Sequence, residues 1–423
     1  IYTTTNIATD HNQLTMEIMQ KVAARHGLVC LLHEKPFAGV NGSGKHNNWS
    51  ISTDTGVNLL SPGETPYENA QFLLFLCAVI KAVDDYQDLL RLSVATAGND
   101  HRLGANEAPP AVVSMFLGDE LNGVLEAIEK DIPYEGAEKT QMKLGVDVLP
   151  KFNRDTTDRN RTSPFAFTGN KFEFRMVGSR DSISACNVVL NTITAEVFKE
   201  VCDRLEKAPD FELAVHDLIK EYATDHQKIV FNGNGYAPEW EKEAKRRGLP
   251  ILPSMVDAIP ALTTEKAVKL FESFDVFSRA ELESRAEIKY EIYSKAINIE
   301  AKTMIDMATK QIIPAVIRYT TVLGESINTV KTAGEGLIDV SVQLDLLKKA
   351  SKLLKAANSA MSKLSKLVEK IPEYAEGRDR AVFCREKVVP AMEALREPVD
   401  ELEMIVDKEM WPMPSYGDLV FEV

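Results

Sequence analysis

The chain contains 423 residues, of which 44% are hydrophobic and 26% are charged, and it carries a formal net charge of −14. This length allows two or three domains with substantial cores, and the composition is that of an ordinary globular protein. The negative charge argues against nonspecific binding to nucleic acid or to an anionic membrane, and no apolar run is long enough to cross a bilayer.

The first residues and the cysteines give expectations about the length of the parent protein and about its cellular compartment. The chain begins with residues 1–5 (IYTTT), without an initiator methionine or a signal peptide, and we expect it to be the C-terminal part of something longer. The five cysteines are scattered, odd in number and never spaced as Cys-x-x-Cys. They predict reduced structural thiols and a cytoplasmic protein.

The first predicted element is a helix over residues 12–26. Its apolar face includes Leu14 and Ile18, and Asp10 is the expected N-cap. The apolar residues 27–32 then predict a buried strand that leads into a glycine-rich loop.

That loop and the residues around it, 33–50, are the most informative part of the chain. The Asn-Gly-Ser-Gly sequence lets the backbone bend and approach a ligand closely, although such sequences also occur in ordinary turns. His46, two asparagines and Ser50 follow within a few residues. A flexible loop followed at once by polar side chains is typical of a site that surrounds a small polar substrate beside a metal. A strand over residues 49–52 is expected to leave the loop.

A long helix and a polar loop are expected next. Thr65 and Glu68 have the spacing of a capping box, which predicts a helix that runs on towards Ala95. A polar loop over residues 98–107 follows, and a further helix is expected to begin near Pro109.

A second polar loop, over residues 153–169, leads into a strand of alternating residues. Lys171, Glu173 and Arg175 share one face of this strand, and phenylalanines occupy the other. A structural ion-pair ladder would produce the same pattern. Because further arginines stand just upstream, the concentration of cations and metal-type ligands favours a phosphate that carries Mg²⁺ or Mn²⁺.

The pattern changes after about Thr263, where long helical segments take over, so we expect two domains, residues 1–262 and 263–423. Between Val340 and Val368, apolar residues are spaced alternately by three and four, as in a coiled coil or a bundle. A helical hairpin or bundle within the chain is favoured over an intermolecular coiled coil.

Four motifs, in this order, resemble those of the glutamine synthetase family and, within it, the large type III enzymes. Residues 41–46 (NGSGKH) resemble the glutamate-binding loop, and residues 102–109 resemble the flap that contains Arg and Glu-Ala-Pro. Residues 160–163 (NRTS) resemble the phosphate-binding segment, and residues 171–175 resemble the strand that supplies a metal carboxylate. The catalytic resemblance covers roughly residues 1–262.

This resemblance implies a fold and an assembly. The expected fold is α+β: a curved antiparallel sheet of the glutamine synthetase and guanido kinase type, with helices packed outside, followed by an α-helical C-terminal extension. Type III members are expected to be homo-oligomers, dodecamers of two stacked hexameric rings. No nucleic-acid or membrane partner is expected.

The resemblance also implies residue roles. ATP would phosphorylate the side-chain carboxylate of L-glutamate, and ammonia would attack the resulting acyl phosphate, with Mg²⁺ or Mn²⁺ offsetting the negative charge. His46 and Glu173 would be ligands of one divalent cation. The other implied roles are substrate binding for Asn41, Gly42, Arg102 and Arg175, nucleotide binding for Asn48, Ser50, Arg161 and Lys171, and catalysis for Glu107 and Arg161.

The chain departs from the family pattern in two ways. The second arginine that usually follows Arg161 is missing, because residues 164–166 read Pro-Phe-Ala. The family's other metal carboxylates belong to strands expected before Ile1, so we expect this chain alone to hold about half of an active site.

Ligation of ammonia to L-glutamate is the expected function. Two alternatives remain open: a γ-glutamyl ligase that uses a larger amine, and a non-catalytic homologue that senses nitrogen status or assists assembly.

Overall fold

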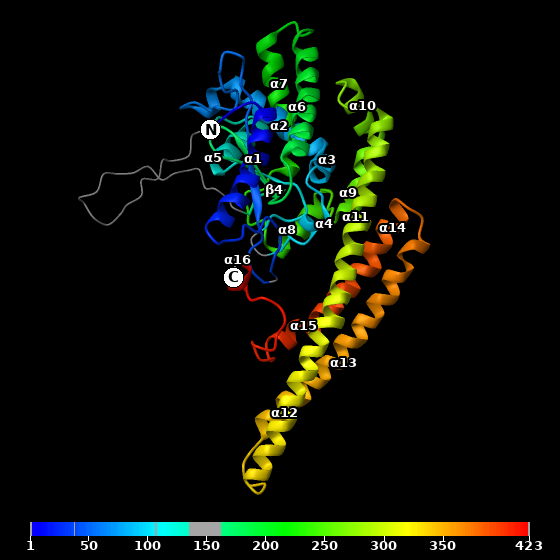
Figure 1. The fold of residues 1–423 in the computed structure, drawn as a ribbon. Helices are drawn as coiled ribbons and strands as arrows, with labels where there is room; N and C mark the ends of the chain where they lie inside the picture. Colours follow the sequence, from blue (N-terminus) through cyan, green and yellow to red (C-terminus); the bar gives the residue numbers. More distant parts are fainter. Residues whose placement is uncertain (1, 38, 106–107, 135–161, 422–423) are drawn as a thin grey trace, which may run out of the picture. The chain divides into compact units, whose positions relative to one another are not determined.

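The structure, a computed structural model, describes residues 2–37, 39–105, 108–134 and 162–421 (Figure 1). These residues form two compact units. The first comprises Ile1–Val22 and Cys30–Glu283, and the second comprises Ala23–Val29 and Ser284–Val423. The first unit combines helices with a small sheet and the second is mainly helical, which confirms the α+β class with a helical extension. The domain boundary at residues 262 and 263 stays a prediction.

The first unit contains a four-stranded sheet. Its strands are β1 (Gly44–Trp49), β2 (Met115–Phe116), β3 (Phe165–Phe167) and β4 (Phe172–Gly178). They lie in the order β1-β4-β3-β2, with β4 antiparallel to β1 and β3, and with β2 parallel to β3. The expectation of an antiparallel sheet is therefore wrong for β2. The long connection between β2 and β3 has room for the crossover that a parallel pair requires.

Helices α2 (Ala70–Asp85), α6 (Ser184–Leu205) and α7 (Phe211–Asp225) pack against one another in the core of the first unit. Helix α2 is buried along most of its length, because its residues are apolar on nearly every side. The other helices of this unit are α1 (Thr5–Arg25, whose last three residues belong to the second unit), α3 (Gln87–Leu92), α4 (Ala97–Asp100), α5 (Asp119–Glu129), α8 (Pro238–Arg246), α9 (Met255–Ala258) and α10 (Glu265–Ser273).

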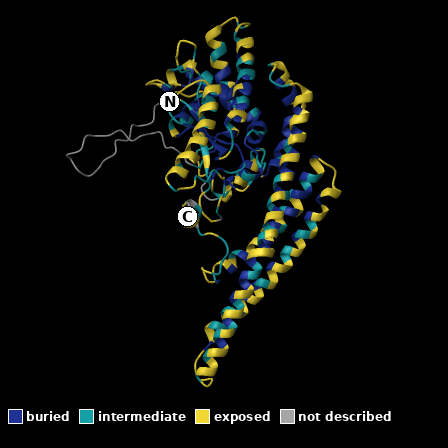
Figure 2. Ribbon diagram, in the orientation of Figure 1, coloured by how far each residue is buried: buried dark blue, intermediate teal, exposed yellow. Residues whose placement is uncertain are grey.

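Long helices form the second unit, and its central helix is α13 (Ser341–Lys370). Its other helices are α11 (Arg279–Met307, whose first turn precedes this unit), α12 (Ile313–Ala333), α14 (Arg378–Phe383), α15 (Val389–Glu403) and α16 (Tyr416–Val420). Helix α13 packs against α12 and α15 of the same chain. Buried residues form stripes along these helices in Figure 2, and Ala350, Ala357 and Leu364 belong to them. The predicted seam is thus used for packing within the chain.

The predictions for residues 12–32 are partly wrong. Helix α1 begins at Thr5, so Asp10 lies inside the helix and is not its N-cap. Residues 27–32, all of them described, form no strand, and Leu28 makes a single bridge to Phe421. Leu28 and Val29 are also exposed, so an apolar run without a neighbouring strand did not produce the expected buried strand.

The predicted long helix over residues 65–95 is divided. Thr65 makes no side-chain cap, and only a short 3₁₀ turn follows it. The α-helix begins after Asn69, whose Oδ1 accepts a hydrogen bond from the N–H of Phe72 at 3.0 Å, and it ends before Tyr86. The local hydrogen bond of Asn69 decides where helix α2 begins.

Two polar segments also differ from expectation. The loop expected over residues 98–107 begins with helix α4, capped by Thr96. Residues 108–114, which are all described, form no helix. Part of the loop predicted over residues 153–169 is strand β3, and residues 153–161 lie outside the described segments.

The strand predictions around the site are right in kind but shifted in place. The strand expected at residues 49–52 instead covers Gly44–Trp49. It therefore includes the end of the glycine-rich loop. The strand expected at residues 171–175 is β4, which begins at Phe172.

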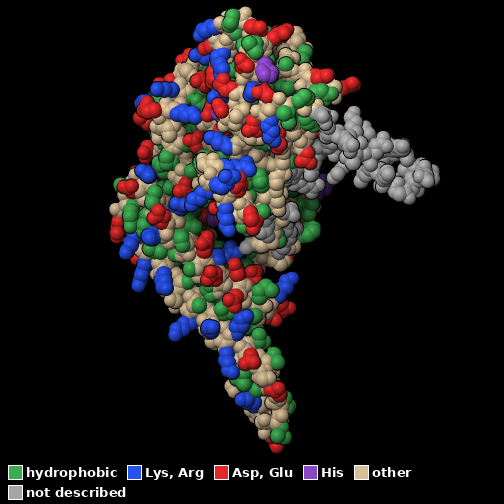
Figure 3. All heavy atoms as spheres, turned by 180° about the vertical axis from the view of Figure 1, so that it is seen from behind, with side chains coloured by type: hydrophobic (Ala, Val, Ile, Leu, Met, Phe, Trp, Pro, Cys, Tyr) green, Lys and Arg blue, Asp and Glu red, His purple; other side chains and the backbone are tan. Residues whose placement is uncertain are grey.

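The surface is charged and the cysteines are free thiols, as expected from the composition. Lysines and arginines are intermingled with carboxylates on the face drawn in Figure 3. Within the described segments, no helix combines the length and the apolar character needed to span a membrane. All five cysteines are described and carry free thiols, and burial raises the pKa of Cys77 to about 12, so this thiol stays protonated.

Candidate functional site

Side chains on one face of strand β1 are hydrogen-bonded to helix α6. Asn47 donates a hydrogen bond to Asn187 Oδ1 at 3.0 Å, and the indole N–H of Trp49 donates to Asn191 Oδ1 at 2.9 Å. Both asparagine acceptors belong to α6. Because side chains alternate along a strand, the intervening residues of β1 point to the opposite face of the sheet.

The opposite face brings together a histidine, a carboxylate and an arginine. Asn48 of β1 is paired in register with Glu173 of β4, and a bulge at His46 interrupts the ladder. His46 Nδ1 lies 3.6 Å from Glu173 Oε2, and Arg175 Nη2 lies 3.1 Å from the same oxygen. Three residues singled out from the sequence, 127 or more positions apart across the two strands, therefore meet at one place.

The protonation of His46 suits a metal ligand. Burial lowers the pKa of its imidazole, the charge of Arg175 lowers it further, and Glu173 opposes these effects. The ring is therefore neutral near pH 7 and has a lone pair to donate. A neutral imidazole beside a carboxylate is a donor pair that fits a divalent cation, and two donors leave the rest of its coordination shell to other groups.

One other group of metal-type side chains occurs among the described residues: Asp84, Asp85 and His226. Its carboxylates already have cationic partners. Asp84 Oδ2 lies 2.7 Å from His226 Nδ1 and 3.3 Å from Lys228 Nζ, and Asp85 pairs with Lys81 at 2.8 Å. This cluster is an ion-pair network between α2 and the end of α7.

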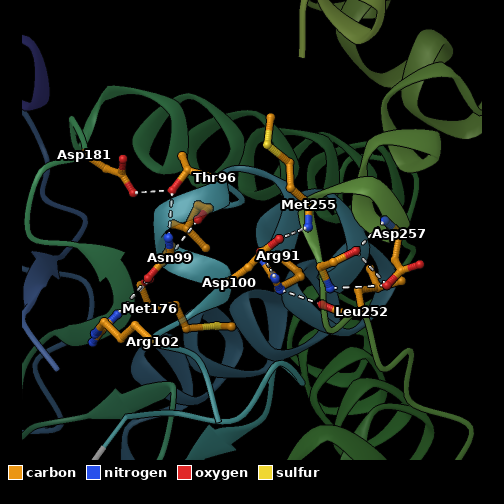
Figure 4. Close-up of polar contacts among 12 residues, drawn as sticks. Arg91, Thr96, Asn99, Asp100, Arg102, Met176, Asp181, Leu252, Met255 and Asp257 are labelled. Atoms are coloured by element: carbon orange, nitrogen blue, oxygen red, sulfur yellow. Dashed lines mark hydrogen bonds and ion pairs between the residues drawn. The ribbon is translucent and has the colours of Figure 1, made fainter. Parts of the chain in front are cut away.

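Arg102 packs against Gly42 and Gly44 of the glycine-rich loop and is bound to strand β4 at Met176 (Figure 4). Its Nη2 donates to the carbonyl of Arg175 at 3.0 Å, and its Nη1 donates to the carbonyl of Met176 at 3.2 Å. The side chain is buried, with 5% of its surface exposed. A Cβ at Gly44 would lie 2.1 Å from Arg102 Nη2, so the loop needs glycine there.

Three other candidate residues, Asn41, Asn48 and Ser50, lie beside a cavity or at the end of strand β1. Asn41 lines a mostly apolar cavity of about 770 Å³ together with Leu103 and Tyr236. Ser50 donates to Asn58 Oδ1 at 2.8 Å, at the end of β1. Asn48 is exposed on the same strand as His46.

The last three candidate residues are those proposed to contact phosphate or to act in catalysis. Lys171 is half-buried and immediately precedes β4. Glu107 and Arg161 lie outside the described residues, so their roles stay predictions.

Sequence reasoning missed one buried acid beside this site, Glu34. Its carboxylate accepts a hydrogen bond from the backbone N–H of Arg180 at 3.1 Å. A glutamate next to Lys-Pro looks like an ordinary surface residue, and no local pattern in the sequence marks it as buried.

Comparison with known proteins gives the family. The model of the glutamine synthetase catalytic domain matches residues 2–109, which include the glycine-rich loop and Arg102, and the model of the glutamine synthetase C-terminal domain matches residues 214–331. The whole chain aligns with a type-3 glutamine synthetase of Dictyostelium discoideum at 44% identity, covering 58% of that protein. It also aligns with glutamine synthetases of Butyrivibrio fibrisolvens (44% identity, 60% covered) and Bacteroides fragilis strain YCH46 (39%, 59% covered).

The chain thus spans about three fifths of the length of these curated relatives, and every part of it takes part in the alignments. The matched segments carry the loop, the arginine and the helical region that the sequence motifs had indicated. The chain belongs to the glutamine synthetase family.

Proposed function

We propose that the full-length protein carrying this chain is a glutamate–ammonia ligase. It uses ATP to join ammonia to L-glutamate through γ-glutamyl phosphate, and it releases L-glutamine, ADP and phosphate, with Mg²⁺ or Mn²⁺ as cofactor. The observation that carries this proposal is the meeting of His46, Glu173 and Arg175 on one sheet face, in a chain of this family.

Charge explains why these residue types stand together. The carboxylate of glutamate has to approach the phosphates of ATP, and both are negative. A divalent cation held by His46 and Glu173 supplies charge neutralisation there. Arg175 adds a positive charge 3.1 Å from Glu173 Oε2, and Lys171 and Arg161 contact the transferred phosphoryl group in this proposal.

The other residues divide between the two substrates. Asn41, Gly42, Arg102 and Arg175 hold glutamate, and the cavity beside Asn41 gives room next to that loop. Asn48 and Ser50 lie along the nucleotide. Glu107 covers the site, accepts a proton from ammonium and keeps water from the acyl phosphate.

The proposal extends to the assembly and its surroundings. We assign the protein to the cytoplasm as a homo-oligomer, a dodecamer of two stacked hexameric rings, without a nucleic-acid or membrane partner. The net charge of −14 supports the last point, since anionic polymers and lipid surfaces repel such a protein.

The test is phosphate release from ATP by the full-length protein with Mg²⁺ and glutamate, with and without ammonium. Strong dependence on ammonium supports the proposal. Turnover with ethylamine but not with ammonium would identify a γ-glutamyl ligase for larger amines. No turnover with either, in a correctly assembled protein, would leave the sensor or assembly homologue.

A variant connects this activity to the site. Glu173→Gln removes the proposed metal carboxylate, and we expect turnover to fall at least about a hundredfold, as when a group that stabilises developing charge is lost. Glu64→Gln, at an exposed position, is the matched control and should keep full activity. Equal activity of the two variants would contradict the role given to Glu173.

A further inference from the structure

Glu34 is a buried carboxylate beside the glycine-rich loop, with 3% of its surface exposed. Its Oε1 accepts a hydrogen bond from the N–H of Arg180 at 3.1 Å, and its backbone carbonyl accepts one from the N–H of Ser43 at 2.8 Å. Burying a carboxylate costs several kcal/mol unless a positive charge or several donors lie near it. The position of Glu34 therefore needs a reason.

The surrounding backbone leaves room for this side chain. A Cβ at Gly98 would lie 2.6 Å from Glu34 Oε2, and a Cβ at Gly178 would lie 2.7 Å from Glu34 Cγ. At either position an added Cβ would force the Glu34 side chain to shift, and at Gly178 it would also displace the Asp181 carboxylate, which lies 2.6 Å away. Helix α4, through Gly98, and the end of β4, through Gly178, thus approach the Glu34 side chain closely.

The charge of Glu34 acts on two cations of this region, Arg102 and Lys45. Burial lowers the pKa of the Arg102 guanidinium, and the negative charge of Glu34 is the strongest influence in the opposite direction. Two opposite charges buried near each other stabilise each other, and removing one leaves the other without compensation. Arg102 also donates to the carbonyls of Arg175 and Met176, so Glu34 acts on a residue already bound to the sheet.

The glycine-rich loop is shaped around this pair. A Cβ at Gly42 would lie 2.9 Å from the carbonyl oxygen of Glu34 and 3.0 Å from Arg102 Cγ. A Cβ at Gly44 would overlap the Arg102 guanidinium. Two loop glycines that resemble the family's glutamate-binding motif are therefore needed to pack against Glu34 and Arg102.

Two more charges lie in the same region. Asp181 accepts a hydrogen bond from Thr96 at 3.3 Å, and its pKa is raised by burial and then by Glu34. The ammonium of Lys45 hydrogen-bonds to the backbone carbonyl of Asp181. The group thus holds two carboxylates and two cations, so that losing one carboxylate unbalances its charge.

We propose that Glu34 is a positioning residue for substrate glutamate: it holds Arg102 and the loop of residues 41–44 in the arrangement that receives the amino acid. This inference rests on the function proposed above. Glu34 itself does not touch the substrate. Because the nucleotide residues Asn48, in β1, and Ser50, just after it, lie further along the chain than the loop glycines, loss of the Glu34 charge affects glutamate binding and spares ATP binding.

The test compares steady-state kinetics of Glu34→Gln, Glu34→Asp and Glu64→Gln in the full-length protein. Glutamine keeps the shape and the acceptor for the Arg180 N–H but removes the charge. We expect Glu34→Gln to raise KM for glutamate at least about tenfold, as when one charge of a buried pair is lost, with KM for ATP within about twofold. Glu34→Asp, which keeps the charge, should recover most of the loss, and Glu64→Gln should match the wild type.

Three results would overturn the proposal: an unchanged KM for glutamate in Glu34→Gln, an equal rise in both KM values, or a fall in kcat alone. If Glu34→Gln does not fold, Gly98→Ala decides, since a Cβ there would lie 2.6 Å from Glu34 Oε2 and displace the carboxylate. It should raise KM for glutamate selectively, and an unchanged value would refute the role. Absence of glutamate-dependent turnover in the wild type would refute the proposed function itself and is seen before any variant is made.

Discussion

Asp100 is a partly exposed carboxylate, with 13% of its side chain accessible, that connects helix α4 to α3 and to the start of α9 (Figure 4). Its Oδ2 accepts a hydrogen bond from the N–H of Met255 at 2.8 Å, and its Oδ1 lies 3.4 Å from Arg91 Nη2. Arg91 also donates to the carbonyl of Leu252 at 2.9 Å. Burial raises the pKa of Asp100 to about 6, and the attraction of Arg91 only partly offsets it.

This raised pKa predicts how stability changes with pH. The unfolded carboxyl has a pKa of about 3.9, so between about pH 4 and pH 6 the folded state holds the proton more tightly than the unfolded state. The contribution of Asp100 is therefore complete below about pH 4 and is lost as the pH rises through about 6. Two pKa units correspond to about 3 kcal/mol as an upper value.

Asp100→Asn tests this expectation through denaturant unfolding between pH 4 and pH 7. The stability difference, wild type minus variant, should fall as the pH rises to about 6 and then level off. Asp54→Asn, at an exposed position, is the control. A difference that grows with pH would show that the ion pair with Arg91 outweighs burial.

At the residue scale, the sequence predicted the candidate metal ligands but not the buried residues around them. His46 and Glu173 were both chosen from their motifs, and the register of β1 with β4 brings them to 3.6 Å. Glu34 was missed, because no local pattern shows that two distant glycines, Gly98 and Gly178, make room for a carboxylate. Burial of a charge depends on segments that meet only in the folded chain.

At the element scale, the start of helix α2 allows a direct test of local capping. The sequence placed the cap at Thr65, whereas Asn69 makes the hydrogen bond to the N–H of Phe72. We expect Asn69→Ala to lower the free energy of unfolding by about 1 kcal/mol, since an orphan helix donor loses its acceptor. Thr65→Ala is the matched variant and should change stability by less than about 0.5 kcal/mol. The reverse order of the two effects would restore Thr65 as the cap.

The sequence predicted the presence of a helix better than it predicted what the helix or a strand packs against. The helix expected at residues 12–26 exists as α1, yet Leu14 and Ile18 on its apolar face are exposed in the described chain. Periodicity shows which residues share a face, but burial requires a partner. The strand β3 was missed because residues 165–167 are too few to show alternation, and their pairing with β4 comes from the fold.

At the scale of the whole molecule, the chain divides into two compact units that have separate cores. The first has its core around α2, where Leu76 is fully buried. The second has its core along α13, where Leu364 is fully buried between neighbouring helices. Units with their own cores can unfold in separate steps, so a single unfolding temperature would not describe this chain.

Two matched variants test this division by calorimetry. Leu364→Ala and Leu76→Ala each remove a fully buried leucine side chain, and each should cost about 2 to 5 kcal/mol in its own unit. We expect two heat-absorption peaks in the wild type, of which Leu364→Ala lowers one and Leu76→Ala lowers the other. Movement of a single peak by both variants would show that the units unfold as one, and that the helical extension depends on the catalytic region for its stability. Independent movement would mean that the extension could change in sequence without loss of the fold around His46 and Glu173.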